Sequence, residues 1–266
     1  MADQFAWQGL SIHLEDYWRP ERVTGSWAEG YLSFAGERDD HLQIRWSSAK
    51  APKDLNKRVL SYFSNLETAA RKRKQPFRSE LDLLDSGDCE FEWHAGPKGY
   101  GRIGWEPITK RIVLVERSGR AGDSFKREAR EMWAGLRGHQ DGLIPWSLFG
   151  LSISLPRMYR FDSFRALSGH ITFKFTNRGS RVRAERWGFG NQLVEAKGLE
   201  KWALIAMGQM QLEKNGDLLT LRKRLPIYRQ NTAFVRHEPE HNRIITLAST
   251  HLRGVEPNTD WLKCDF

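Results

Sequence analysis

The sequence has little cysteine and no long apolar run. Its 266 residues include two cysteines, Cys89 and Cys264, which are too few for a disulfide framework and suit a reducing compartment. No stretch approaches the roughly 18 apolar residues that a transmembrane helix requires, and residues 1–10 lack the basic-then-apolar order of a secretory signal. These absences predict a cytoplasmic protein with no membrane partner.

Two short patterns are typical of catalytic sites, and neither has the context that its chemistry needs. The run 237-HEPEH-241 has the spacing of a zinc peptidase helix, but Pro239 breaks the helix that would bring both histidines to one metal. We therefore expect a hairpin turn there. Gly99, Gly101 and Gly104 match a dinucleotide-binding pattern, but a β-prone run follows instead of a helix, so we expect a flexible hairpin loop. The sequence thus predicts no metal and no cofactor, and it favours a role without catalysis.

The chain contains two similar halves. Residues 9-GLSIHL-14 match 150-GLSISL-155, and four further blocks follow in the same order at offsets of 132 to 143 residues. Ordered self-similarity of this kind indicates a tandem duplication. We expect a first repeat over 1–121, a helical connector over 122–141, and a second repeat with a C-terminal tail over 142–266.

Each half is predicted to contain three strands, a helix and two further strands. Apolar residues at helical spacing predict helices over 54–74 and 199–214. The predicted fold class is therefore α+β, with two tandem pseudo-repeats, each a mostly antiparallel sheet with one helix across a face.

Two known folds share this pattern. The run 150-GLSISLP-156, followed by Tyr159 and the strand 169-GHITF-173, resembles the start of domains of the PsbP/Mog1 type. The duplicated sheet-and-helix plan is similar to the saddle of the TATA-binding protein. Both resemblances imply half domains of α+β type.

Most of the excess of positive over negative charge lies in the second half of the chain. Residues 1–141 carry 23 Lys and Arg against 22 Asp and Glu, whereas residues 142–266 carry 19 against 11, so the two parts have net charges of +1 and +8. This asymmetry indicates an anionic partner, either nucleic acid or an acidic protein surface. A surface that only keeps the protein soluble is the alternative explanation.

Three basic runs supply the candidate nucleic-acid-binding or anion-binding residues. They are Arg71, Lys72, Arg73, Lys74, Arg181, Arg183, Arg186, Arg222, Lys223 and Arg224. Phe173 and Phe175 lie near the second run and could stack on bases if exposed, but their spacing of two favours burial in a sheet. The acidic run 80–92 is expected to be a charged linker or a docking surface.

The leading interpretation is a non-catalytic binding or assembly protein. We expect it to be a component of a larger complex that uses the basic second half to engage nucleic acid or an acidic protein. One alternative is a metal-independent ribonuclease that uses His94 or His237, which the comparison of the halves places in equivalent positions. The other is a purely structural subunit that binds protein partners.

Overall fold

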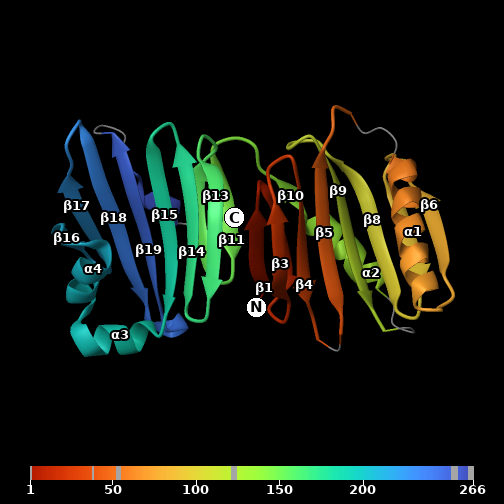
Figure 1. Cartoon of the computed structure of the whole chain (residues 1–266), viewed down its shortest axis with the longest axis horizontal. Helices are drawn as coiled ribbons and strands as arrows, with labels where there is room; N and C mark the ends of the chain where they lie inside the picture. Colours follow the sequence, from red (N-terminus) through yellow and green to blue (C-terminus); the bar gives the residue numbers. More distant parts are fainter. Residues whose placement is uncertain (1, 38, 52–54, 121–124, 253–256, 263–266) are drawn as a thin grey trace. The chain divides into compact units, whose positions relative to one another are not determined.

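The computed structural model divides the chain into two compact units, Met1–Gln140 and Asp141–Phe266. It describes residues 2–37, 39–51, 55–120, 125–252 and 257–262. The described residues are mostly strands, which form antiparallel sheets (Figure 1).

The first unit is built on a seven-stranded sheet with the order β3-β4-β5-β9-β8-β7-β6. Its strands are β3 (Arg19–Gly25), β4 (Glu29–Ala35), β5 (His41–Ser48), β6 (Arg78–Leu83), β7 (Cys89–His94), β8 (Lys98–Glu106) and β9 (Arg111–Gly119). A smaller group of antiparallel strands comprises β1 (Ala2–Trp7), β2 (Leu10–Glu15) and β10 (Arg137–Gly138). The helices of this unit are α1 (Leu55–Lys72) and α2 (Lys126–Gly135).

Helices α1 and α2 pack on opposite faces of the first sheet. On α1, Val59 and Phe63 are buried one turn apart and contact a core that includes Phe91 of β7. On the α2 side, Ala129 packs with Tyr100 of β8. Phe91 pairs with Gly101, so it shares a face with Gly101 and not with the neighbouring Tyr100. Because neighbouring residues of a strand point to opposite faces, α1 and α2 lie on different sides of the sheet.

The glycine-rich run from Gly99 to Gly104 lies within β8, so the prediction of a flexible loop there is wrong. Gly99 pairs with Trp93 and Gly101 pairs with Phe91 in the register of β7 and β8. The two aromatic rings occupy the space that a Cβ atom at either glycine would fill. Packing therefore requires glycine at both positions, because an aromatic side chain of the neighbouring strand lies directly over each one.

The second unit is built on another seven-stranded sheet, with the order β13-β14-β15-β19-β18-β17-β16. Its strands are β13 (Arg160–Leu167), β14 (His170–Asn177), β15 (Ser180–Gly188), β16 (Gln211–Asn215), β17 (Leu218–Arg224), β18 (Arg229–Glu238) and β19 (Arg243–Leu252). A hairpin precedes it, formed by β11 (Leu143–Leu148) and β12 (Leu151–Pro156). The helices are α3 (Gly190–Lys197), α4 (Leu199–Met207) and the 3-10 turns η1 (Pro239–His241) and η2 (Thr259–Leu262). The strand order of this sheet corresponds, position for position, to that of the first unit.

The prediction of an α+β fold with one helix across each sheet is wrong, because the protein is mostly β and has few helices. The sequence pattern did not predict the strands at the sheet edges. All six residues of β6 (Arg78–Leu83) are exposed, and β13 has no buried residue. Strands with little burial lack the alternation of apolar and polar residues by which a strand is recognised. The helix expected over 199–214 ends at Met207, and β16 begins at Gln211.

The strand order also corrects the alignment of the two histidines. His94 ends β7, whose counterpart in the second sheet is β17, whereas His237 lies in β18. The two residues are therefore not equivalent. The hairpin turn expected at residues 237–241 is observed, because β18 and β19 pair antiparallel on either side of η1.

Candidate functional site

Strand β15 carries three of the predicted arginines, and its alternation separates them. Arg181 and Arg183 lie on the sheet face that α4 partly covers, whereas Arg186 lies on the opposite face. Lys174 of β14 is directly opposite Arg183 in the register, so it shares the face with the first pair. Residues two apart on a strand are roughly 6.5 to 7 Å apart, which places these charges within reach of one extended ligand.

Three further cations extend this face across the sheet. On β13, Arg160 and Arg165 lie opposite threonines of β14 on the same side. Lys223 of β17 lies opposite Asn231, which lines the same pocket as Arg181. We call the six residues together the basic face: Arg160, Arg165, Lys174, Arg181, Arg183 and Lys223. All six side chains are exposed.

Few carboxylates balance these charges. The buried Glu185 forms an ion pair with Arg183, whose Nε lies 3.1 Å from one carboxylate oxygen, and its other oxygen lies 3.0 Å from Nε2 of His170. Among the described residues that line the hollows of this face, Asp162 is the other carboxylate. Within the part of the chain that the structure describes, the remaining five cations have no side-chain hydrogen bond or ion pair. Their charge is therefore available to a ligand.

A pocket of about 620 Å³ opens on the basic face. Lys174, Arg181 and Arg183 line it from the sheet, and Met207 and Met210 line it from the end of α4 and the segment that follows. A smaller hollow of about 210 Å³ on the same face also includes Lys174 and Arg183, so these two cations border both. The pocket therefore combines cations, which bind carboxylates or phosphates, with flexible thioethers, which adapt to apolar groups.

The pocket offers no exposed aromatic ring. Phe175 is the one aromatic residue among those lining it, and its side chain is fully buried in the core on the other side of the sheet. Phe173 is likewise fully buried, as its spacing predicted. A surface on which nucleic-acid bases could stack is thus missing from the lining of this pocket.

The other predicted residues do not join the basic face. The guanidinium of Arg186 donates to the carbonyl oxygen of Phe149 at 3.2 Å, and burial lowers its pKa. Arg222 and Arg224 alternate with Lys223 and so point to the opposite face; Arg222 is paired with a glutamate of β16 at 2.6 Å. The run from Arg71 to Lys74 lies in the first unit, at the end of α1, where cations favour the helix dipole.

Sequence reasoning missed Lys174, Arg160 and Arg165. The burial of Phe173 and Phe175 on β14 implies that Lys174 between them points the other way, so its place was recoverable from the spacing. No such signal marks the two arginines, because β13 itself lacked a strand pattern.

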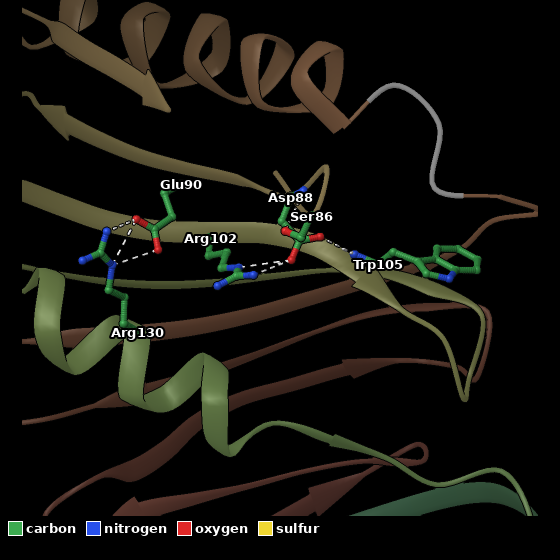
Figure 2. Close-up of polar contacts among 6 residues, drawn as sticks. All are labelled: Ser86, Asp88, Glu90, Arg102, Trp105 and Arg130. Atoms are coloured by element: carbon green, nitrogen blue, oxygen red, sulfur yellow. Dashed lines mark hydrogen bonds and ion pairs between the residues drawn. The ribbon is translucent and has the colours of Figure 1, made fainter. Parts of the chain in front are cut away.

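The acidic run 80–92, expected to be a charged linker or a docking surface, contains the end of β6 and the start of β7, and two of its carboxylates are paired with arginines of the same unit. Figure 2 shows Arg102 beside Asp88, and Arg130 of α2 beside Glu90. Arg102 donates to Asp88 at 2.6 Å, and Arg130 donates to Glu90 at 2.5 Å. Tyr100 also donates to Glu90. The hydrogen bonds from Arg130 hold the pKa of Glu90 below its usual range. The Arg130–Glu90 pair connects α2 to β7, and the Arg102–Asp88 pair connects β8 to the turn before β7.

The two histidines of the nuclease alternative lie in separate units, and His94 is exposed whereas His237 is half-buried. Nε2 of His94 lies 3.0 Å from a carboxylate oxygen of Glu92, and Nε2 of His237 lies 2.8 Å from Oδ1 of Asn191. Each therefore has a local hydrogen-bond partner that fixes its ring.

Comparisons with known proteins found a weak structural likeness and no match to a family model or a curated protein. One solved structure that matches is the immunity protein TplEi of the T6SS from Pseudomonas aeruginosa, in complex with a peptide named "L". The likeness has a TM-score of 0.34 and 11% identity, and it covers 100% of this chain and 91% of the other. A likeness this weak supports no inference about function. None of the described helices is long and apolar enough to cross a membrane.

Proposed function

We propose that the protein is a binding protein, without catalysis of its own, that holds an acidic segment of a partner protein on the basic face. A place as one component of a larger assembly fits this role. The observation that carries the proposal is the pocket between Lys174, Arg181 and Arg183, whose rim includes Met207 and Met210. Such a pocket favours carboxylates beside an apolar side chain.

The energetics favour a protein partner over nucleic acid. Exposed ion pairs contribute only about 0.2 to 1 kcal/mol each, so charges on a rim set orientation and rate more than affinity. Affinity comes mainly from a side chain buried in a pocket, and the two methionines supply such a pocket for an apolar residue. In this pocket nucleic acid would gain the attraction of the charges but would find no aromatic ring for its bases to stack on, and its binding would be weak and strongly dependent on salt.

The proposal is tested by fluorescence anisotropy on the full chain. The probes are a labelled poly-glutamate peptide, the same peptide with one central leucine, and labelled single-stranded and double-stranded RNA and DNA, each at about 50 and about 200 mM salt. We expect the leucine peptide to bind more tightly than poly-glutamate and to keep that advantage at the higher salt.

Each other outcome identifies an alternative. Tighter binding of a polynucleotide than of either peptide would replace the proposed partner with nucleic acid. Cleavage of RNA that disappears in His94→Ala or His237→Ala would support the ribonuclease. Failure of every probe to bind would leave the role of a structural subunit that binds through other surfaces.

A further inference from the structure

The first unit contains a pocket of about 750 Å³ beside α1, above β3, β4 and β5. Arg22, Arg45 and Arg58 line it, together with Tyr31 and Tyr62. All three arginines are exposed. We call this site the arginine pocket. Its residues belong to a different unit from those of the basic face, so variants can alter the two sites separately.

Two arginines and two tyrosines alternate along one side of the arginine pocket. The guanidinium carbon of Arg45 lies 5.0 Å from the centre of the Tyr31 ring and 5.4 Å from that of Tyr62. Arg22 lies 5.8 Å from the Tyr31 ring. Cation–π contacts of this kind hold a guanidinium in place while leaving its edge accessible to a ligand.

A buried network fixes the position of Arg45. Its Nε donates to Oε1 of Gln43 at 3.0 Å, and Nε2 of Gln43 donates to Glu116 at 2.6 Å. The hydroxyl of Tyr62 donates to the other oxygen of Glu116 at 2.6 Å. The guanidinium of Arg45 is therefore held by its contacts with the two tyrosine rings and by the hydrogen bond from its Nε. Among the described residues, none accepts a hydrogen bond from its two terminal nitrogens, which carry the donors that a bidentate oxyanion needs.

The charge of the arginine pocket selects an anion. Glu29 is the one carboxylate among its lining residues, against three arginines. On α1, Arg58 donates to the hydroxyl of Ser47 at 2.9 Å, which directs it over the end of β5, and Ser61 adds a further hydroxyl to the lining. Arginine forks and hydroxyl donors together match the oxygens of a phosphate group, which carries a charge of about −1.5 to −2 near neutral pH.

We propose that the arginine pocket binds a phosphomonoester, with Arg45 and Arg58 contacting the phosphate. The pocket volume falls within the usual range for small-ligand sites, roughly 300 to 1,000 Å³, so it accommodates the organic part of the ester as well as the phosphate. The phosphate can belong to a small molecule or to a phosphorylated side chain, and the probes distinguish these two sources.

The test is isothermal titration of the full chain with inorganic phosphate, phenyl phosphate and a phosphotyrosine peptide. We expect saturable binding of phenyl phosphate with one ligand per chain, tighter than that of inorganic phosphate. A peptide that binds more than about tenfold tighter than phenyl phosphate would assign the phosphate to a protein side chain, and a smaller difference would assign it to a small molecule.

Four variants locate the site. Arg45→Gln and Arg58→Gln are each expected to weaken phenyl phosphate binding by about tenfold or more, and Arg45→Lys by less than Arg45→Gln, because lysine keeps the charge but loses the fork. Arg127→Gln is the matched control, since it removes one exposed arginine of the same unit on α2, and its affinity should stay within about twofold of the parent protein.

Three results would overturn the proposal. They are no saturable binding of phenyl phosphate, an unchanged affinity in both Arg45→Gln and Arg58→Gln, and an equal loss in Arg127→Gln. Arg58 lies on the exposed side of a helix, so its variant tests the site even if Arg45→Gln disturbs the fold. A double variant of the basic face, Lys174→Glu with Arg183→Glu, should leave phenyl phosphate binding unchanged, which separates failure here from failure of the proposed function.

Discussion

Glu116 is a carboxylate buried between α1 and the first sheet, and its replacement tests the account of this core. Its two oxygens accept hydrogen bonds from Gln43 at 2.6 Å, Tyr62 at 2.6 Å and Trp93 at 3.0 Å. In Glu116→Gln the amide oxygen can keep the bonds from Tyr62 and Trp93, so one bond is lost, at about 1 kcal/mol. In Glu116→Ala the Tyr62 hydroxyl and the Trp93 indole lose their acceptor, whereas Nε2 of Gln43 still donates to the Tyr62 hydroxyl at 2.7 Å. Each of the two unpartnered donors costs about 1 to 3 kcal/mol, so we expect a loss of roughly 2 to 6 kcal/mol.

The stability of the protein should also depend on pH through Glu116. Burial raises the pKa of Glu116 above its usual range. Between the ordinary glutamate pKa of about 4.3 and the raised folded value, the folded protein therefore holds a proton that the unfolded chain has released. The free energy of unfolding consequently falls as the pH rises through that window, by about 1.4 kcal/mol for each pH unit between the two pKa values. Glu116→Gln cannot ionise and lacks this contribution.

The assay is urea unfolding followed by tryptophan fluorescence, from about pH 5 to about pH 9, for the parent protein and both variants. We expect the unfolding free energy of Glu116→Gln to approach that of the parent, or exceed it, at the alkaline end. Parallel curves for the two proteins across the whole range would refute the reasoning, because Glu116 would then titrate as it does in the unfolded chain.

Three further predictions concern stability. Gly99→Ala should destabilise the first unit by about 2 kcal/mol or more in urea, because the new methyl group meets the ring of Trp93; an unchanged midpoint would contradict that packing. Glu90→Gln should lower the free energy of unfolding by about 2 to 3 kcal/mol near pH 7. Because the pKa of Glu90 is lowered in the folded protein, the difference in unfolding free energy between parent and variant should shrink as the pH falls through that lowered pKa. Ile227 and Tyr228 adopt φ of 58° and 54° at a hairpin tip, where they are 84% and 77% exposed. Replacing them with Asn and Gly, which tolerate positive φ, should raise the melting temperature. A lower melting temperature would show that the tip packs against the fold.

Much of the local structure could be predicted from the sequence where burial imposes a period. The helix expected over 54–74 is observed as α1, because its apolar residues face the sheet at helical spacing. The alternation around Phe173 and Phe175 likewise identified β14 and its buried side. The edge strands β6 and β13 gave no such signal, because most of their side chains contact solvent on both faces.

The comparison of the two halves was limited by a one-residue difference in a hairpin. In the first sheet Phe34 pairs with Leu42, eight residues later, whereas in the second Phe175 pairs with Val182, seven residues later. A single slip in a strand exchanges its two faces. The offset of 141 residues that relates the opening blocks of the halves therefore aligns the buried Leu42 with the exposed Arg183, and only the register shows that Arg183 pairs with Lys174.

The candidate site needed information that no single run of sequence contains. Lys223 and Arg160 lie far apart in the chain and come to one face only through the order of six adjacent strands. Conversely, Arg222 and Lys223 are neighbours in sequence and lie on opposite faces. Counting charges located the basic half of the chain, but pairing decides which charges act together.

The most direct test of the proposed function compares two double charge reversals in the leucine-bearing acidic peptide assay. Lys174→Glu with Arg183→Glu alters the basic face, and Arg71→Glu with Lys72→Glu makes the same change in net charge at the end of α1. The proposal predicts that the first variant loses affinity by at least about tenfold, while the second stays within about threefold of the parent. Equal losses in the two variants would mean that the peptide responds to overall charge, and the basic face would not be the binding site.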